Sequence, residues 1–163
     1  MGRRLVSLVG TSPGVLHTTL CKLLEHRLLS FSELDEVLVI STREQWATEA
    51  IEIARSCPCP ATGNSPLQPG VKTSIYVTPF NDVDSQERLH NLRGLLAEII
   101  DEGDIVDVTG GRKAMTVTAV VEAKERGATV VMTHIPPETY REIAEETKPC
   151  RKTRPEQAVL LQF

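Results

Sequence analysis

Short apolar runs alternate along this chain with longer stretches of helical periodicity. The apolar runs, rich in branched side chains, predict buried strands at residues 5–9, 37–40, 73–77, 104–108 and 129–132. Apolar residues that recur three and four positions apart predict helices at residues 15–28, 42–54, 84–100 and 112–126. Alternating strands and helices predict an α/β protein of Rossmann-like architecture, with a doubly wound, mostly parallel sheet and helices on both faces.

The C-terminal part of the chain is more polar, and we expect it to extend this sheet. Residues 1–135 form the expected core of a single domain that covers residues 1–163. Residues 136–163 then supply a short helix around residues 141–146 and an edge strand at residues 158–163. That strand is antiparallel to its neighbour and brings the sheet to about six strands.

Residues at the predicted helix ends support the helical ranges. Thr42 with Gln45, and Asp84 with Glu87, have the spacing of capping boxes. Gly127 follows the last helix of the core, where a glycine commonly ends a helix. These signals place the start of two helices and the end of a third.

Charge and hydropathy restrict the possible partners. The formal net charge of −4 argues against a protein that coats duplex nucleic acid through bulk electrostatics. No apolar run approaches the roughly 20 residues that cross a bilayer, so we expect a cytoplasmic protein without a membrane partner. Any polyanionic ligand must then be bound by a local positive field.

The four cysteines do not have the spacing of a metal site. Cys21 falls within a predicted helix and is expected to be a small core residue. Cys57 and Cys59 are not a CxxC pair, and no second close Cys or His pair completes a zinc site. A bridge from either to Cys150 is an alternative if the source is a hyperthermophile, where intracellular disulfides occur. Residues 57–70, with four of the ten prolines, form a long loop.

The first predicted strand ends in a glycine-rich turn, Gly10–Gly14. One interpretation is structural: Ser12 is the N-cap of the next helix and Pro13 its first residue. The other is functional: the Ser12 hydroxyl and the N–H groups that follow point toward a bound phosphate or sugar. The turn alone does not decide between them.

A second glycine-rich turn, in the segment DVTGGRKAM at residues 107–115, follows the fourth predicted strand. Neither turn fits the dinucleotide-binding motif GxGxxG, and the second lacks the spacing of the P-loop motif GxxxxGK[ST]. The turns therefore predict neither a dinucleotide-binding site nor a P-loop. Arg112 and Lys113 open the next helix, where cations oppose the macrodipole by some tenths of a kcal/mol each. They are either a solvated pair or a site whose anionic ligand offsets that repulsion.

Together the two turns resemble the CARF fold of CRISPR-associated proteins, and more narrowly the stand-alone CARF ring nucleases of archaeal type III CRISPR systems. The resemblance rests on a strand followed by GTSPG and on a strand, DVTGGRKAM and a helix, and covers essentially the whole chain. It implies a homodimer that binds a cyclic oligoadenylate, chiefly the tetra-adenylate ring. It also implies cleavage of that ring, which switches off antiviral signalling.

Carried over by motif position, the resemblance implies Ser12 and Lys113 as the catalytic pair. The expected ligand-binding residues come from both turns and from the region after the fifth strand: Gly10, Thr11, Pro13, Gly14, Thr109, Gly110, Gly111, Arg112, Met115, His134 and Tyr140. Tyr140 either stacks on an adenine or packs as a loop residue. His17 is either functional or a helix-surface residue, and Trp46 is expected to pack or to form an interface rather than to stack on a base.

The implied chemistry needs no metal and no cofactor. An RNA phosphodiester carries its own nucleophile, the neighbouring 2′-hydroxyl, which the protein only has to hold in line with the leaving 5′-oxygen. Lys113 stabilises the charge that develops on phosphorus oxygens, and Ser12 orients the phosphate or the hydroxyl. The expected products are linear adenylates with 2′,3′-cyclic phosphate ends. The alternative is a non-catalytic CARF sensor that binds the ring and signals to a partner.

Overall fold

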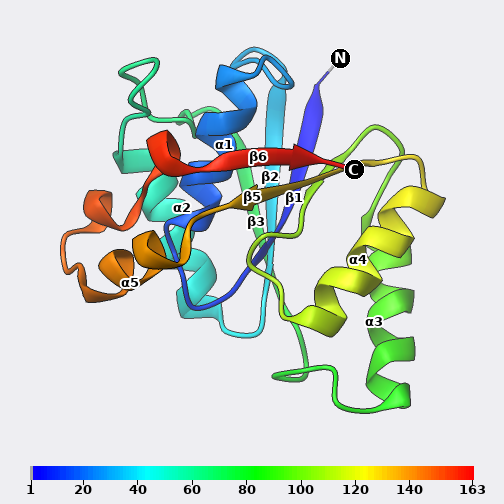
Figure 1. Ribbon diagram of the computed structural model, residues 1–163. Coiled ribbons are helices and arrows are strands. Elements are labelled where there is room, and N and C mark those ends of the chain that lie inside the picture. The colour runs from blue at the N-terminus through cyan, green and yellow to red at the C-terminus, as the bar shows by residue number, and fades with distance from the viewer. Residues whose placement is uncertain (1) are drawn as a thin grey trace.

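The computed structural model describes residues 2–163 and contains one six-stranded sheet with helices on both faces (Figure 1). The strands lie in the order β3-β2-β1-β4-β5-β6. Their bounds are β1 Arg3–Val9, β2 Leu34–Ser41, β3 Lys72–Val77, β4 Ile105–Asp107, β5 Thr129–His134 and β6 Val159–Gln162. Neighbouring strands are parallel except for β6, which runs antiparallel to β5. The predicted doubly wound sheet and its antiparallel edge strand are confirmed.

The central strand β1 lies where the strand order reverses. Leu5 of β1 pairs with Val37 of β2 on one side and with Ile105 of β4 on the other. Leu5 and its neighbour Val6 are fully buried, as expected for a strand covered on both faces. The carboxyl ends of parallel strands at such a reversal open a crevice that commonly binds ligands. The turns after β1 and β4 are located there.

Two helix layers cover the sheet, α1 and α2 on one face and α3 and α4 on the other (Figure 1). The helix bounds are α1 Val15–Glu25, α2 Glu44–Ser56, α3 Gln86–Ile99, α4 Lys113–Glu125 and α5 Pro137–Glu145, followed by the 3-10 turns η1 Pro149–Lys152 and η2 Pro155–Gln157. Each layer encloses its own apolar core, because alternate residues of β1 point to opposite faces. Within residues 2–163, no helix has both the length and the apolar character needed to cross a bilayer.

The predicted start of α2 is wrong. The helix begins at Glu44 after Arg43, which is extended, and no side chain caps it. Thr42 and Gln45 therefore do not form a capping box. Because β2 continues to Ser41 in register with β1 and β3, Thr42 is left in the turn between strand and helix.

The other helix ends agree more closely with the predictions. The Ser85 hydroxyl, rather than Asp84, caps α3 by accepting the N–H of Arg88 at 3.1 Å. Gly127 has a φ of 77°, which confirms its role in ending α4. Helix α5 starts earlier than predicted, at Pro137, because proline suits the first position of a helix.

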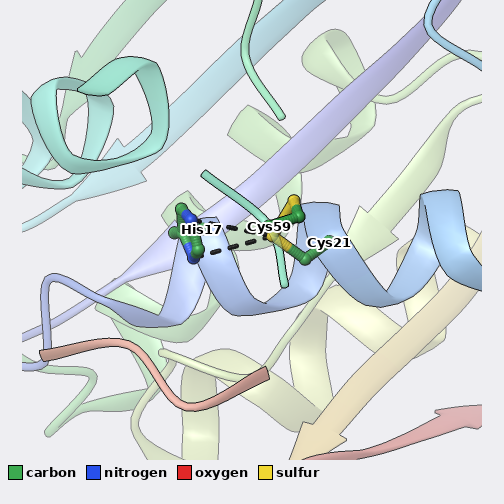
Figure 2. A group of neighbouring side chains, drawn as sticks. All are labelled: His17, Cys21 and Cys59. Atoms are coloured by element: carbon green, nitrogen blue, oxygen red, sulfur yellow. Dashed lines mark hydrogen bonds between the residues drawn. A yellow bond between two sulfur atoms is a disulfide. The ribbon is translucent and has the colours of Figure 1, made fainter. Parts of the chain in front are cut away.

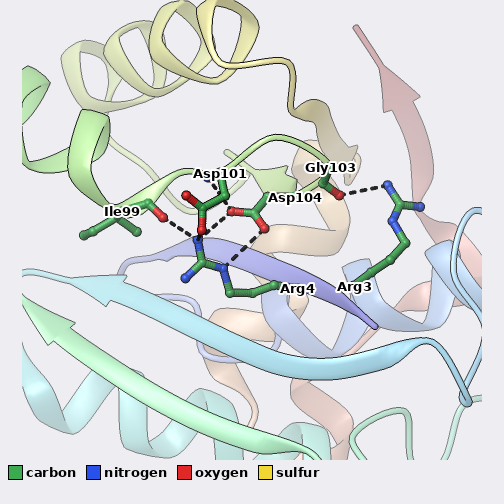
Figure 3. A network of polar contacts seen from close by, with 6 residues as sticks. All are labelled: Arg3, Arg4, Ile99, Asp101, Gly103 and Asp104. Atoms are coloured by element: carbon green, nitrogen blue, oxygen red, sulfur yellow. Dashed lines mark hydrogen bonds and ion pairs between the residues drawn. The ribbon is translucent and has the colours of Figure 1, made fainter. Parts of the chain in front are cut away.

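An ion pair fixes β1 against β4 at the sheet edge opposite the crevice. Arg4 donates to Asp104 from Nε at 3.3 Å and from Nη2 at 2.6 Å (Figure 3). The same guanidinium donates to the carbonyl of Ile99 at the end of α3. Asp104 also accepts the N–H of Asp101 at 2.9 Å. A two-pronged pair of this kind is geometrically specific, so it helps to set the register of the two strands.

Two disulfides join the long loop at residues 57–70 to the rest of the molecule. They are Cys21–Cys59 and Cys57–Cys150. The second confirms the alternative of a bridge to Cys150. Cys21 is buried as expected, but it is half of a bridge and not a free core thiol. The loop is thereby tied both to α1 and to the C-terminal extension.

Reduction of these disulfides is expected to destabilise the fold. The bridges span 38 and 93 residues of sequence, so they restrict the unfolded chain strongly. We expect the free energy of unfolding, measured by urea titration, to fall by about 2 to 5 kcal/mol for each bridge lost. The double substitution Cys57→Ser and Cys150→Ser isolates the longer bridge. Equal urea midpoints for oxidised and reduced protein would contradict this prediction.

Candidate functional site

The two glycine-rich turns meet at the carboxyl ends of β1 and β4. A Cβ atom at Gly10 would lie 2.8 Å from the carbonyl oxygen of Gly110. A Cβ atom at Gly110 would in turn overlap the carbonyl oxygen of Leu8. Backbones approach this closely only where neither residue has a side chain. The expectation that both turns lie at one edge of the sheet is confirmed.

A pocket of about 110 Å³ opens between these turns and the end of β2. Its lining residues are Leu8, Val9, Gly10, Thr11, Ile40, Thr42, Trp46, Gly110, Gly111, Arg112 and Met115. These described residues include apolar side chains, two hydroxyls and one guanidinium, and none of them carries a carboxylate or an imidazole. The lining therefore suits a ligand that combines negative charge with apolar surface.

The predicted site residues divide into two groups around this pocket. Those that line it are Gly10, Thr11, Gly110, Gly111, Arg112 and Met115. Those outside its lining are Ser12, Pro13, Gly14, Thr109, Lys113, His134 and Tyr140. Ser12 and Lys113, however, directly follow Thr11 and Arg112 in the chain, so both lie at the margin of the pocket.

Ser12 lies half-buried in the turn between β1 and α1. The helix begins at Val15, its N-cap is Gly14, and no side chain caps it. The interpretation of Ser12 as N-cap and Pro13 as the first helical residue is therefore wrong. A Cβ atom at Gly14 would overlap the carbonyl oxygen of Lys152, so the C-terminal extension packs directly behind this turn.

Lys113 is the first residue of α4, and Arg112 is the N-cap. Both side chains are exposed. Arg112 donates to Asp82 at 3.2 Å, whereas within residues 2–163 no acidic side chain forms an ion pair with Lys113. The first turn of α4 contains no acidic residue either. A bound anion would relieve the repulsion between these cations and the positive end of the helix.

Three helices begin beside the pocket, and in the described part of the chain none of them has a side-chain cap. These are α1, α2 and α4. Of the helices that contribute no residue to the lining, α3 is capped by Ser85, whereas α5 has no side-chain cap. Free N–H groups at helix N-termini, together with the helix dipole, favour the binding of anions. The N-termini of α2 and α4 therefore offer backbone donors to a phosphate, whereas the first turn of α1 is buried.

A buried carboxylate lies beneath the second turn. Asp107 ends β4 and is fully buried, and this burial raises the pKa of its carboxyl group. One oxygen accepts the hydroxyl of Ser7 at 2.8 Å. The other accepts the N–H of Thr109 at 3.0 Å and its hydroxyl at 2.5 Å. Because these donors favour the ionised form, they offset part of the effect of burial, and they anchor the turn to β4.

His134 and Tyr140 lie beyond the pocket, in and after the end of β5. His134 is exposed at the last position of the strand. Tyr140 is half-buried in a small apolar cluster with Ile135 and Ile143. Burial, and to a lesser degree the negative charge of Asp107, raises the pKa of the Tyr140 hydroxyl. Tyr140 therefore packs as a residue of α5, so the alternative of a packed loop residue is wrong about the element it belongs to.

His17 is a core residue of α1, so the expectation of a helix-surface position is wrong. It is fully buried, and its Nε2 lies 2.8 Å from the carbonyl oxygen of Cys57, to which the neutral ring donates. Burial lowers the pKa of this imidazole. Figure 2 shows the ring beside the Cys21–Cys59 bridge. Metal ligation requires thiolates, and both sulfurs are committed to the disulfide, so this cluster fits a structural role.

A side chain at Gly110 is expected to separate the two turns. In Gly110→Ala the new methyl group overlaps backbone atoms of β1, which have little freedom to move. We expect the free energy of unfolding to fall by about 1 to 3 kcal/mol, measured by urea titration. Gly94→Ala in α3 is the matched control, because nothing lies within 4 Å of that position, and it should stabilise the helix. Similar losses in both variants would argue against a critical approach at Gly110.

Trp46 lines the pocket although no motif in the sequence marks it, and Thr42 lines it although its motif predicted a helix cap. The expected order of strands in the sheet could nevertheless have indicated them. In a doubly wound sheet the second strand commonly lies beside the first, so the turn after β2 is brought to the same edge as the turn after β1. The residues that follow a neighbouring strand are therefore candidates for the site even without a motif.

Comparison with known proteins places this chain among characterised relatives. No protein-family model matches it. It is 30% identical over 146 residues to the CRISPR system ring nuclease SSO2081 of Saccharolobus solfataricus, a match that covers 89% of this chain and 78% of that protein. The match therefore extends over nearly the whole chain.

Two solved structures have a similar fold. Csm6 of Enterococcus italicus, bound to cyclic hexa-2′-fluoro-hexa-dAMP, matches 84% of this chain and 35% of its own length with a TM-score of 0.54 and 15% identity. Can2 of Sulfobacillus thermosulfidooxidans, in complex with cyclic tetra-adenylate, matches 79% of this chain and 31% of its own length with a TM-score of 0.50 and 13% identity. The chain spans about a third of either protein. These likenesses confirm the predicted CARF fold.

Proposed function

Because the chain belongs to the family of CRISPR system ring nucleases, we propose that it binds cyclic tetra-adenylate and cleaves it, and thereby switches off type III CRISPR signalling. The observation that carries this proposal is the meeting of the GTSPG and TGGRK turns at one edge of the sheet. There they combine the uncapped N-terminus of α4 with Arg112 and Lys113. This arrangement supports the recognition of a ligand with several phosphates.

The proposed reaction uses the nucleophile of the substrate itself. A 2′-hydroxyl of the ring attacks the adjacent phosphorus, the bond from phosphorus to the 5′-oxygen breaks, and a 2′,3′-cyclic phosphate forms. The 2′-hydroxyl loses its proton to solvent, and the leaving 5′-oxygen takes one up. In this proposal Lys113 stabilises the charge on the phosphorus oxygens, and Ser12 orients the phosphate or the attacking hydroxyl.

The proposed chemistry requires neither a metal ion nor a cofactor. The lining residues of the pocket offer hydroxyls, backbone groups and one guanidinium as polar partners. Such groups position a phosphate and stabilise its charge, but they are weak bases. We therefore propose slow turnover, because the described residues that line the pocket include no strong general base.

A homodimer is proposed because one pocket is too small for the ring. Its 110 Å³ is well below the roughly 300 to 1,000 Å³ of pockets that enclose drug-sized ligands. Helix α4 supplies a surface for the second copy: Val117 and Val121 are 62% and 42% exposed and follow Lys113 at intervals of four residues. Residues spaced in this way share a helix face. A twofold partner on this face would bring both copies of Lys113 to one shared site.

The rival function is a sensor that binds the ring and leaves it intact. Incubation with cyclic tetra-adenylate, followed by chromatography, separates the two functions. The proposal predicts that the ring is converted to linear adenylates at a rate proportional to protein concentration. Binding measured by calorimetry without any linear product would establish the sensor. An absence of binding would reject both functions.

A further inference from the structure

We propose that the pocket between the two turns is a subsite for one adenine of the ring, and that Trp46 is its stacking platform. This inference rests on the proposed function and deepens it by naming the residue that recognises a base. Trp46 lies in the first turn of α2, is partly exposed, and lines the pocket together with both glycine-rich turns. Stacking on an aromatic ring is worth about 1 to 3 kcal/mol per base.

Trp46 is the single tryptophan of the chain and the one aromatic side chain among the described residues of this lining. A tryptophan that served only the core would be enclosed by α1 and β2, as Ala47 and Ala50 of the same helix are. Instead its ring borders a hollow that also receives Arg112 from the other turn. Its position is therefore that of a ligand-facing group.

The ring of Trp46 is held in place by a neighbouring cation. The guanidinium carbon of Arg43 lies 5.1 Å from the ring centroid, a contact worth about 0.5 to 1 kcal/mol at an exposed site. This contact covers part of the ring and restricts its rotation. A platform oriented in advance loses less conformational entropy when a base stacks on it.

The rest of the lining fits a purine. Ile40 and Met115, both buried, form the apolar floor of the pocket beneath the position proposed for the base. The hydroxyls of Thr42 and Thr11 are positioned in the same lining to donate to ring nitrogens or to accept from the exocyclic amine. The glycines leave the backbone of the turns accessible to the attached sugar and phosphate. A base in this pocket would thus place its phosphate at the N-terminus of α4.

The test uses the fluorescence of Trp46, because no other tryptophan contributes to it. The probe is a 2′-fluoro cyclic tetra-adenylate, which lacks the attacking hydroxyl and so stays intact. We expect saturating ring to change the Trp46 emission strongly. Trp46→Leu should weaken binding, measured by calorimetry, by about fivefold to 150-fold, while Trp46→Phe should retain most of the affinity. Phe31→Leu, at an exposed loop residue, is the matched control and should bind normally.

The outcomes separate this inference from the proposed function. If the ring binds, but the Trp46 emission stays constant and Trp46→Leu binds like the unaltered protein, the adenine subsite is overturned and ring recognition stands. If the unaltered protein binds no ring by calorimetry, the proposed function fails and the inference fails with it. Circular dichroism of Trp46→Leu shows whether its fold is retained. If it is not, the ring affinity of Trp46→Phe, measured by calorimetry, tests the inference instead.

Discussion

Lys113→Ala is expected to lower the rate of ring cleavage by about 100-fold to 1,000-fold, the usual cost of removing one group that stabilises developing charge. Lys113 opens α4 beside the meeting point of the two turns, and no acidic side chain within residues 2–163 forms an ion pair with it. Its charge is therefore available to the phosphate. The rate is measured in single turnover with saturating protein, so that weaker binding does not enter the result.

The affinity of Lys113→Ala for the ring should fall much less than the rate, because the backbone donors and Arg112 remain. The matched control is Lys72→Ala, which removes the same charge from an exposed position at the start of β3, at the opposite edge of the sheet. It should cleave at the normal rate. A Lys113→Ala rate within twofold of the unaltered protein would remove this residue from the mechanism.

Replacing Val117 and Val121 together by Asp is expected to produce a monomer that no longer cleaves the ring. Both valines are exposed on the helix face that begins with Lys113, and two carboxylates there would oppose burial against a second copy. Light scattering at micromolar concentration should change from a dimeric to a monomeric mass. Cleavage should fall by at least about 100-fold, because each copy supplies only part of the charge stabilisation.

Val159→Asp is the matched control for this double variant. Val159 lies on the edge strand β6 and is 55% exposed, close to the exposure of the valines of α4. We expect it to remain a dimer and to cleave normally. A monomer in this variant, with an intact dimer in the α4 variant, would move the interface to β6. A monomeric mass for the unaltered protein, with and without the ring, would contradict the shared site itself.

The fold was predictable because hydrophobic period and turn residues agree along most of the chain. The branched apolar run around Leu5 and the stripe along α3 leave little choice between strand and helix. Helix starts were harder to predict. Thr42 has the right spacing for a capping box, but the pairing of β2 extends to Ser41 and leaves Thr42 facing the pocket. A side-chain cap stabilises a helix end by only about 1 kcal/mol. The hydrogen bonds that pair Ser41 of β2 with β3 override this preference.

The site was predictable where a motif marked it and hidden where only the tertiary structure creates it. The two turns contact each other through glycines, which have no side chain to keep the backbones apart. Gly10 and Gly110 could therefore be identified from the sequence. Trp46 reaches the pocket because β2 lies beside β1 in the sheet. No local sequence pattern around Trp46 predicts this neighbour. The pairing of Cys21 with Cys59 depends on how the long loop packs against α1. Such contacts follow from the assembled fold and not from spacing along the chain.

The central claim is that this protein opens the ring by attack of a 2′-hydroxyl of the ring itself, without a metal ion. The most direct measurement is a single-turnover incubation with cyclic tetra-adenylate in excess EDTA, with the products identified by mass spectrometry. The account predicts linear adenylates with 2′,3′-cyclic phosphate ends, formed at the same rate with and without EDTA, and no product from the 2′-fluoro ring. Cleavage that stops in EDTA, or products with simple phosphate ends from the first time point onward, would contradict it.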